Sequence, residues 1–273
     1  MSINLKGTLV LAGCGKMGGA MLEGWLKAGA DPKKIVAVDP NPPHEVQDLL
    51  ARHGIRHNPP IATITDAEVI IIAVKPQVME EVLPNLVSLK SSNPLILSVA
   101  AGKTIATFAK HFGEDAAIIR TIPNTPAAIG RGITAMSSNP NVTAAQMALA
   151  TALLSSTGEV VTVENESMID LVTAVSGSGP AYVFYLTECL ANAGVKIGLP
   201  ANLAMQLARA TVTGSGELMR QSGIDAATLR QNVTSPKGTT SAALQILMAD
   251  DGMEPLFEKA IAAAALRSKE LAS

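Results

Sequence analysis

The chain has 273 residues, and 21 Lys plus Arg stand against 23 Asp plus Glu, which gives a net charge of −2. This length can support two domains that each bury a core. The balanced charge argues against nucleic acid or another polyanion as a partner. Two cysteines, Cys14 and Cys189, are too few for a disulfide framework. We therefore expect a reducing, cytoplasmic location and no metal site.

Neither a secretory signal nor a membrane segment is expected. Residues 1–6 contain no apolar core of the kind that secretory signals carry. The uncharged stretch 171–187 is long, but Gly177, Gly179 and Pro180 interrupt it. We interpret it as a buried segment and expect no membrane partner.

The first motif lies between a predicted strand at 8–12 and a predicted helix around 20–26. Its residues are Gly13, Cys14, Gly15, Lys16, Met17 and Gly18. A second strand at 35–38 ends at Asp39. A G-x-G-x-x-G between strand and helix, followed by an acid about twenty residues later, is a dinucleotide-binding fingerprint.

The physics of this motif is specific. Gly13 permits the tight turn, Gly15 lets the backbone approach a pyrophosphate, and Gly18 lets the helix pack closely on the strand. The pyrophosphate is expected on the helix N-terminus, where free N–H groups and the positive dipole end favour an anion.

Strands and helices then alternate along the chain. Apolar runs predict strands at 68–74, 95–99, 116–122, 132–136 and 160–163. Helices are predicted between them at 75–89, 104–111 and 143–154. Such alternation predicts an α/β fold with a doubly wound, mainly parallel Rossmann sheet. We assign residues 1–163 to this dinucleotide-binding domain.

Residues 164–273 show helical patterns and no strand signal. Helices are predicted at 180–193, 200–221, 241–249 and 253–272, and Pro180 and Pro200 stand where helices begin. Charge is sparse along the whole chain, at 16%, and especially between Pro180 and Gln221. The helices of this Ala-rich half are therefore expected to be buried on several sides, as in an oligomer interface. We assign 164–273 to an all-helical substrate and dimerisation domain.

Ligands of a doubly wound sheet bind at the carboxyl ends of the strands. The loop residues there that are predicted to contact the cofactor are Val74, Lys75, Pro76, Ala100, Ala101, Gly102 and Asn124. Asn124 either hydrogen-bonds a nicotinamide carboxamide or holds its own loop. Lys75 either contacts the cofactor or is a solvated lysine at a helix start.

The segment 234–240 precedes a predicted helix. Thr239 or Thr240 is a plausible N-cap, and Gly238 tolerates positive φ. Successive N–H groups in such a turn can hold a carboxylate, but the residues alone favour a capping turn without a ligand. Glu188 is a lone acid on an apolar helix. It is either a proton donor of raised pKa or, as is more common for such residues, an acid that pairs with another side chain or lies at the solvated edge of the helix.

Five segments together resemble the pyrroline-5-carboxylate reductase family along essentially the whole chain: 13–18, 73–76, 123–126, 176–182 and 234–240. The resemblance implies an N-terminal Rossmann domain and a C-terminal helical domain that intertwines into homodimers, often assembled into decamers. It also implies that the loop from Ser235 to Thr240 holds the substrate carboxylate. On this basis the substrate-binding residues are Ser235, Lys237, Gly238, Thr239 and Thr240, and Thr240 is catalytic through contact with the ring nitrogen.

Two positions depart from the family pattern. Lys237 stands where the family commonly has glycine. Asp39 begins a segment in which many relatives carry a serine or arginine for the phosphate of NADP. A carboxylate there would favour the ribose 2′-OH of NAD, while Asn41, Arg56 and Asn58 could contact the 2′-phosphate of NADP. We expect NADPH as cofactor, with Asn58 in its site and NADH as an alternative.

The expected activity is NAD(P)H-dependent reduction of 1-pyrroline-5-carboxylate to L-proline, the last step of proline biosynthesis. Alcohol oxidation needs a base, whereas a protonated cyclic imine accepts hydride without one. After Ser176 no lysine or histidine occurs before Lys196, which argues against the first alternative, a two-domain β-hydroxyacid dehydrogenase-like oxidoreductase. A non-catalytic dinucleotide-binding protein is the second.

Overall fold

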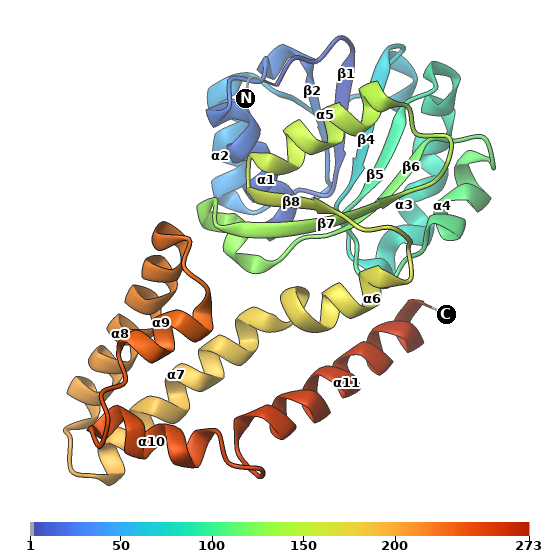
Figure 1. Cartoon of the computed structure of the whole chain (residues 1–273). Coiled ribbons are helices and arrows are strands. Elements are labelled where there is room, and N and C mark those ends of the chain that lie inside the picture. Colours follow the sequence, from blue (N-terminus) through green and yellow to red (C-terminus); the bar gives the residue numbers. More distant parts are fainter. Residues whose placement is uncertain (1–2, 273) are drawn as a thin grey trace. The chain divides into compact units, whose positions relative to one another are not determined.

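The computed structural model describes residues 3–272 and divides into two compact units. One unit contains the chain up to Gly177 together with the segment from Ala265 onward, and we call it the sheet unit. The other, Ser178–Ala264, we call the helical unit. In Figure 1 the sheet is drawn in blue to green, and the helices that follow it in yellow to red. None of the helices in the described residues is long and apolar enough to cross a membrane.

The described part of the sheet unit contains an eight-stranded sheet in the order β3-β2-β1-β4-β5-β6-β7-β8. Its strands are β1 (Thr8–Ala12), β2 (Ile35–Val38), β3 (Arg56–His57), β4 (Ala67–Ile72), β5 (Leu95–Ser98), β6 (Ile118–Ile122), β7 (Gly132–Ser138) and β8 (Gly158–Thr162). Neighbouring strands are parallel except for β6 and β7. The predicted doubly wound Rossmann sheet is confirmed. Strands β2 and β3 are added on one side of β1, and β4 and the later strands on its other side.

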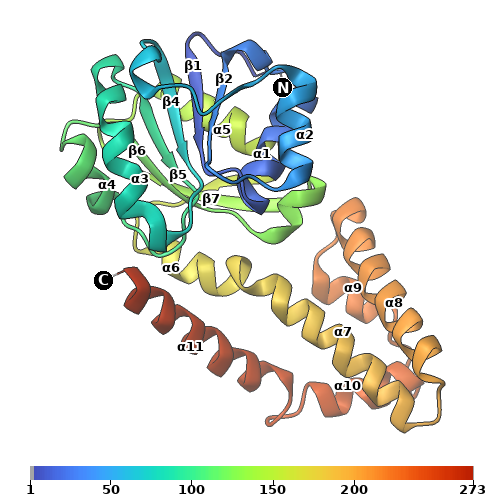
Figure 2. The same ribbon diagram turned by 180° about the vertical axis from the view of Figure 1, so that it is seen from behind.

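Helices cover both faces of the sheet (Figures 1 and 2). One face carries α1 (Lys16–Lys27), α2 (His44–His53) and α5 (Ala144–Ser155), and the other carries α3 (Met79–Leu86) and α4 (Ile105–Phe112). Leu9 and Leu11 of β1 pack on the first face and Val10 on the second, as expected for a strand buried on both sides. Trp25 is fully buried, and its Nε1 donates to the carbonyl of Leu153 at 2.9 Å.

The helices from residue 168 onward are α6 (Met168–Val172), a π-helical turn (Thr173–Gly177), α7 (Gly179–Lys196), α8 (Ala201–Ser222), α9 (Ala226–Asn232), α10 (Thr239–Leu247) and α11 (Met253–Ala272). Pro180 lies in the first turn of α7, and Pro200 is the N-cap of α8. The all-helical character predicted for this half is confirmed. Helix α9 was not predicted, because its seven residues are too short for a clear apolar period.

One expected helix differs in detail, and two short elements were not expected. The helix expected at 75–89 is divided into a 3₁₀ turn (Pro76–Val78), α3 and a second 3₁₀ segment (Val87–Ser92). Pro84 lies inside α3 and lacks the N–H that a continuous helix would use. The short strand β3 and helix α2 were not predicted, since neither has a long apolar run.

Candidate functional site

The fingerprint turn lies at the carboxyl end of β1. Gly13 has a φ of +95°, and a Cβ there would lie 2.7 Å from the backbone carbon of Ala73. A Cβ on Gly18 would lie 2.1 Å from the carbonyl oxygen of Gly13. A Cβ on Gly15 would meet nothing within 4 Å. Gly13 and Gly18 therefore serve the turn and the packing, whereas Gly15 borders open space of the kind that a pyrophosphate needs.

The start of α1 is suited to an anion. Gly15 is its N-cap and offers no side-chain cap, and no acidic residue occupies the first turn. The first N–H groups of a helix have no acceptor within the helix. Together with the positive end of the dipole, they make the backbone of Lys16, Met17 and Gly18 a site for a phosphate group.

Asp39 is tied to the fingerprint through its carboxylate. Its Oδ2 accepts from the backbone N–H of Cys14 at 2.6 Å, and its Oδ1 accepts from that of Asn41 at 2.9 Å. Asn58, with a φ of +48°, accepts from the N–H of Asp39 at 2.9 Å and donates to its carbonyl at 2.8 Å. The structure thus brings Asp39 and Asn58 together beside the fingerprint. The bond from Asp39 to Cys14 has no signal in the sequence.

Cys14 is an inert part of this turn. Its side chain is fully buried, and burial, followed by the charge of Asp39, raises the pKa of the thiol from 9.0 to about 12. Nucleophilic cysteines need a thiolate. Cys14 therefore acts as a small apolar residue under the turn.

The loops after β4 and β5 lie beside the fingerprint, because these strands follow β1 in the sheet. Val74 approaches Gly13 closely, and Lys75 is exposed at the start of the 3₁₀ turn that begins with Pro76. After β5, Ala100 is buried, Ala101 is exposed and Gly102 has a φ of +70°.

Two residues that hold the loop after β5 were not predicted. The Oγ of Ser98 accepts from the N–H of Ala100 at 3.2 Å, and the hydroxyl of Thr121 donates to the carbonyl of Ser98 at 2.8 Å. Both residues are fully or almost fully buried. A polar residue that ends an otherwise apolar strand, as Ser98 does, is the signal that could have found them.

Asn124 has a partner within its own loop. Its Oδ1 accepts from the N–H of Ile133 at 3.0 Å, across the turn between β6 and β7. This bond supports the loop-holding alternative. The side-chain NH₂ group of Asn124 can still donate, so a contact with a carboxamide is compatible with it.

The loop that precedes α10 differs from expectation in two ways. Gly238 has a φ of −79°, so its tolerance of positive φ is not used, and the left-handed residue is Lys237 with a φ of +61°. The N-cap is Gly238 and not Thr239 or Thr240. A Cβ on Gly238 would lie 2.4 Å from the Oγ of Ser235 and 3.1 Å from its carbonyl oxygen, so a side chain there would require Ser235 to move. Lys237 adopts a left-handed backbone conformation that a glycine would adopt without strain.

The N-terminus of α10 is itself free of a side-chain cap. The N–H of Gly238 closes the turn by donating to the carbonyl of Ser235 at 3.0 Å. The next N–H groups, at Thr239 and Thr240, therefore belong to an uncapped helix start that can accept a carboxylate. Thr239 is exposed and Thr240 half-buried.

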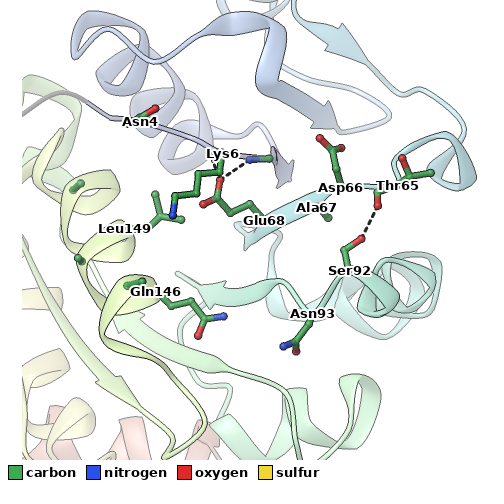
Figure 3. Close-up of a pocket in the computed structure, with 14 residues that line it drawn as sticks. Asn4, Lys6, Thr65, Asp66, Ala67, Glu68, Ser92, Asn93, Gln146 and Leu149 are labelled. Atoms are coloured by element: carbon green, nitrogen blue, oxygen red, sulfur yellow. Dashed lines mark hydrogen bonds between the residues drawn. The ribbon is translucent and has the colours of Figure 1, made fainter.

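Two other features do not form a site. Glu188 is exposed on α7. A cavity of about 710 Å³ lies at the amino ends of the strands, between α5 and the segments that lead into β1, β4 and β5 (Figure 3). The carboxylate of Glu68 there accepts the N–H groups of Lys6 and Gly7, at 2.6 and 2.8 Å. This edge is opposite to the one where such sheets bind ligands. The described residues also contain no cluster of side chains that could hold a metal ion.

Comparisons with known proteins agree with this arrangement. Residues 166–271 match a family model described as pyrroline-5-carboxylate reductase dimerisation, and residues 8–102 match one described as NADP oxidoreductase, coenzyme F420-dependent. A pyrroline-5-carboxylate reductase of Pseudomonas aeruginosa is 36% identical over 97% of this chain and 96% of its own length.

Solved structures give the same result. A pyrroline-5-carboxylate reductase of Coxiella burnetii superposes with a TM-score of 0.91 at 31% identity, covering 98% of this chain and all of the other. A pyrroline carboxylate reductase of Plasmodium falciparum, solved with NADP bound, gives a TM-score of 0.82 at 28% identity and covers both chains fully. With a Rossmann fingerprint, a helical second half and relatives that match over nearly its whole length, this chain belongs to the pyrroline-5-carboxylate reductase family.

Proposed function

We propose that this protein reduces 1-pyrroline-5-carboxylate to L-proline, the final step of proline biosynthesis, with NADPH as the hydride donor. The observation that carries the proposal is the fingerprint turn at β1, with open space at Gly15 and an uncapped start of α1, in a chain that belongs to this family.

The sheet unit fits the cofactor. The open space beside Gly15 and the free N–H groups of α1 suit a pyrophosphate. When bound, NADPH supplies a hydride from its nicotinamide ring. The proposed cofactor-binding residues are Gly13, Cys14, Gly15, Lys16, Met17, Gly18, Asp39, Asn58, Val74, Lys75, Pro76, Ala100, Ala101, Gly102 and Asn124.

NADPH is the preferred cofactor in this proposal, and NADH the alternative. Support comes from the NADP named for the matching family model and for the P. falciparum structure. Both carboxylate oxygens of Asp39 already accept backbone N–H groups. Because a carboxylate has about four acceptor positions, Asp39 can still accept from the 2′-OH of NADH. We expect both cofactors to work, with a modest preference for NADPH.

The loop from Ser235 to Thr240 is proposed to hold the substrate. Its residues Ser235, Lys237, Gly238 and Thr239 would bind the carboxylate, mainly through N–H groups at the start of α10. The hydroxyl of Thr240 would contact the ring nitrogen and is the proposed catalytic group. No side chain is required as a general base, because the imine nitrogen can bind already protonated.

The proposed functional division runs at residues 163 and 164, with the cofactor on the first part and substrate binding and dimerisation on the second. The exposed apolar side chains of α7 and α8, described below, support a homodimer. Association of dimers into decamers and a cytoplasmic location are proposals that depend on the family resemblance and on the low cysteine content.

One assay separates this proposal from its alternatives. Purified protein is mixed with NADPH, and absorbance at the nicotinamide band is followed with and without 1-pyrroline-5-carboxylate. We expect NADPH consumption only with the imine. Formation of NADPH from NADP⁺ and a β-hydroxyacid, without turnover of the imine, would support the dehydrogenase alternative. NADPH binding with no turnover of any substrate would support a non-catalytic role.

A further inference from the structure

Arg120 is a buried cation in the middle of β6. Its guanidinium is 3% exposed, and it pairs with two carboxylates. Nη1 lies 3.1 Å from Oε1 of Glu166, and Nη2 lies 3.3 Å from Oδ1 of Asp170. Each carboxylate has more acceptor positions than the guanidinium fills. Other donors must fill the remaining positions, because a buried charge that is incompletely paired is costly.

The additional donors come from distant segments. Oε1 of Glu166 accepts from the N–H of Ile105, the first residue of α4, at 2.7 Å. Oδ1 of Asp170 accepts from the hydroxyl of Ser268, near the end of α11, at 2.8 Å. Ser268 is 7% exposed. The network of Arg120, Glu166, Asp170 and Ser268, which we call the arginine network, therefore links β6, α6, α4 and α11.

The segment around Glu166 and the last turn of α11 both contact the loop after β5 or its end. Glu166 fixes the chain at Ile105, directly after this loop. One turn beyond Ser268, Leu271 lies against Gly102: a Cβ on Gly102 would be 3.1 Å from the carbonyl oxygen of Leu271 and 3.3 Å from its Cβ. The loop Ala100–Gly102 is thus packed against the last turn of α11, and Ser268 anchors that turn.

We propose that Ser268 is a positioning residue for the cofactor-side loop Ala100–Gly102, acting through the last turn of α11. The inference rests on the proposed function, since it takes this loop as part of the NADPH site. Without the hydroxyl of Ser268, Asp170 keeps its ion pair with Arg120, but α11 loses its hydrogen bond to the network. The loop is then less ordered in the free protein, and ordering it on binding costs affinity for NADPH.

The test compares three variants of the full-length protein by fluorescence titration with NADPH and by steady-state kinetics. For Ser268→Ala we expect the Kd and KM for NADPH to rise about three- to ten-fold, the size of the net contribution of one ordinary hydrogen bond. The KM for the imine should change little. Ser268→Thr keeps the hydroxyl and should restore affinity to within about two-fold of the wild type.

Arg267→Ala is the matched control. Arg267 lies on the same turn but is exposed and pairs with Glu270 at the surface, so its loss should leave NADPH affinity unchanged. Unchanged affinity in a folded Ser268→Ala protein, or equal losses in Ser268→Ala and Arg267→Ala, would overturn the inference. Failure to reduce the imine despite normal NADPH affinity in the wild type would instead refute the proposed function alone.

Discussion

The sheet unit completes a hydrophobic core of its own, and the helical unit does not. Both faces of the sheet are covered, and residues such as Leu9, Val10 and Trp25 are fully buried. In the helical unit, all of whose residues are described, the buried apolar side chains are Ala191, Ala204 and Ala208. Large side chains remain outside, among them Phe184 at 62% and Ile246 at 74% exposure.

This difference has a physical meaning. Soluble monomers rarely expose so many large apolar groups close together, and α7 and α8 expose such groups along their length, including Val183, Leu186, Leu190, Leu207 and Leu218. The alanines between α7 and α8 allow close packing but bury little area. The sheet unit therefore buries its apolar residues within itself, while the exposed apolar side chains of α7 and α8 agree with the dimerisation family model that matches residues 166–271.

The largest expected effect concerns assembly. We predict that the wild type is an obligate homodimer, and that Phe184→Glu combined with Leu207→Glu gives monomers, because two charges would be buried in the apolar contact. Multi-angle light scattering at micromolar concentration measures this directly. The matched control is Lys90→Glu, which makes the same net charge change on the exposed surface of the sheet unit and should remain dimeric. A wild type that is a stable monomer would contradict the inference that the exposed apolar side chains of the helical unit form a dimer contact.

The second prediction separates folding from binding within the fingerprint. Gly18→Ala should destabilise the sheet unit, because its Cβ would lie 2.1 Å from a backbone oxygen. Gly15→Ala should fold with the melting temperature of the wild type, since its Cβ meets only open space. It should nevertheless lose NADPH affinity by roughly ten- to a hundred-fold through a blocked charged hydrogen bond. Thermal melts and fluorescence titration read the two effects, and full affinity in Gly15→Ala would mean the pyrophosphate binds elsewhere.

The third prediction concerns the loop before α10. Thr240→Ala should lower kcat/KM for the imine by roughly three- to a hundred-fold, because it removes one hydrogen bond to a charged ring nitrogen. Thr240→Ser, which keeps a hydroxyl, should retain most of the activity. NADPH affinity should stay at the wild-type level in both. Wild-type imine kinetics in Thr240→Ala would show that the loop is only a helix start.

The smallest expected effect is a loss of stability at alkaline pH. The folded pKa of Cys14, about 12, lies above its ordinary value of 9.0, so the unfolded chain loses the thiol proton first. The contribution of the neutral Cys14 thiol to the free energy of unfolding is complete below pH 9 and is lost as the pH rises toward 12. Between pH 8 and pH 10 the wild type should lose about 1 kcal/mol more unfolding free energy than Cys14→Ala. Denaturant titrations at both pH values test this, and equal losses would argue against a buried neutral thiol.

Much of the sheet unit could be predicted from the sequence. The strand at 8–12, the glycines of the fingerprint and the strand at 35–38 are local patterns, and their periodicity or spacing reports burial and turn geometry directly. The change from alternating strands and helices to helices alone indicated a helical second half, as the structure has from Met168 onward. The scarcity of charge in the segment 180–221 indicated a surface that needs a partner.

Other features depend on hydrogen bonds between residues far apart in the sequence, which no local pattern predicts. The bond from Asp39 to the N–H of Cys14 joins residues 25 apart, and the bond from Ser268 to Asp170 joins residues 98 apart. In the loop before α10, Gly238 could have tolerated positive φ, but the left-handed conformation falls on Lys237, and a Cβ on Gly238 would crowd Ser235. Sequence patterns predict which residues are buried and which form turns, because burial periodicity and turn geometry depend on neighbours along the chain. Which donor meets which carboxylate was decided only by the tertiary structure, because packing alone brings such distant segments together.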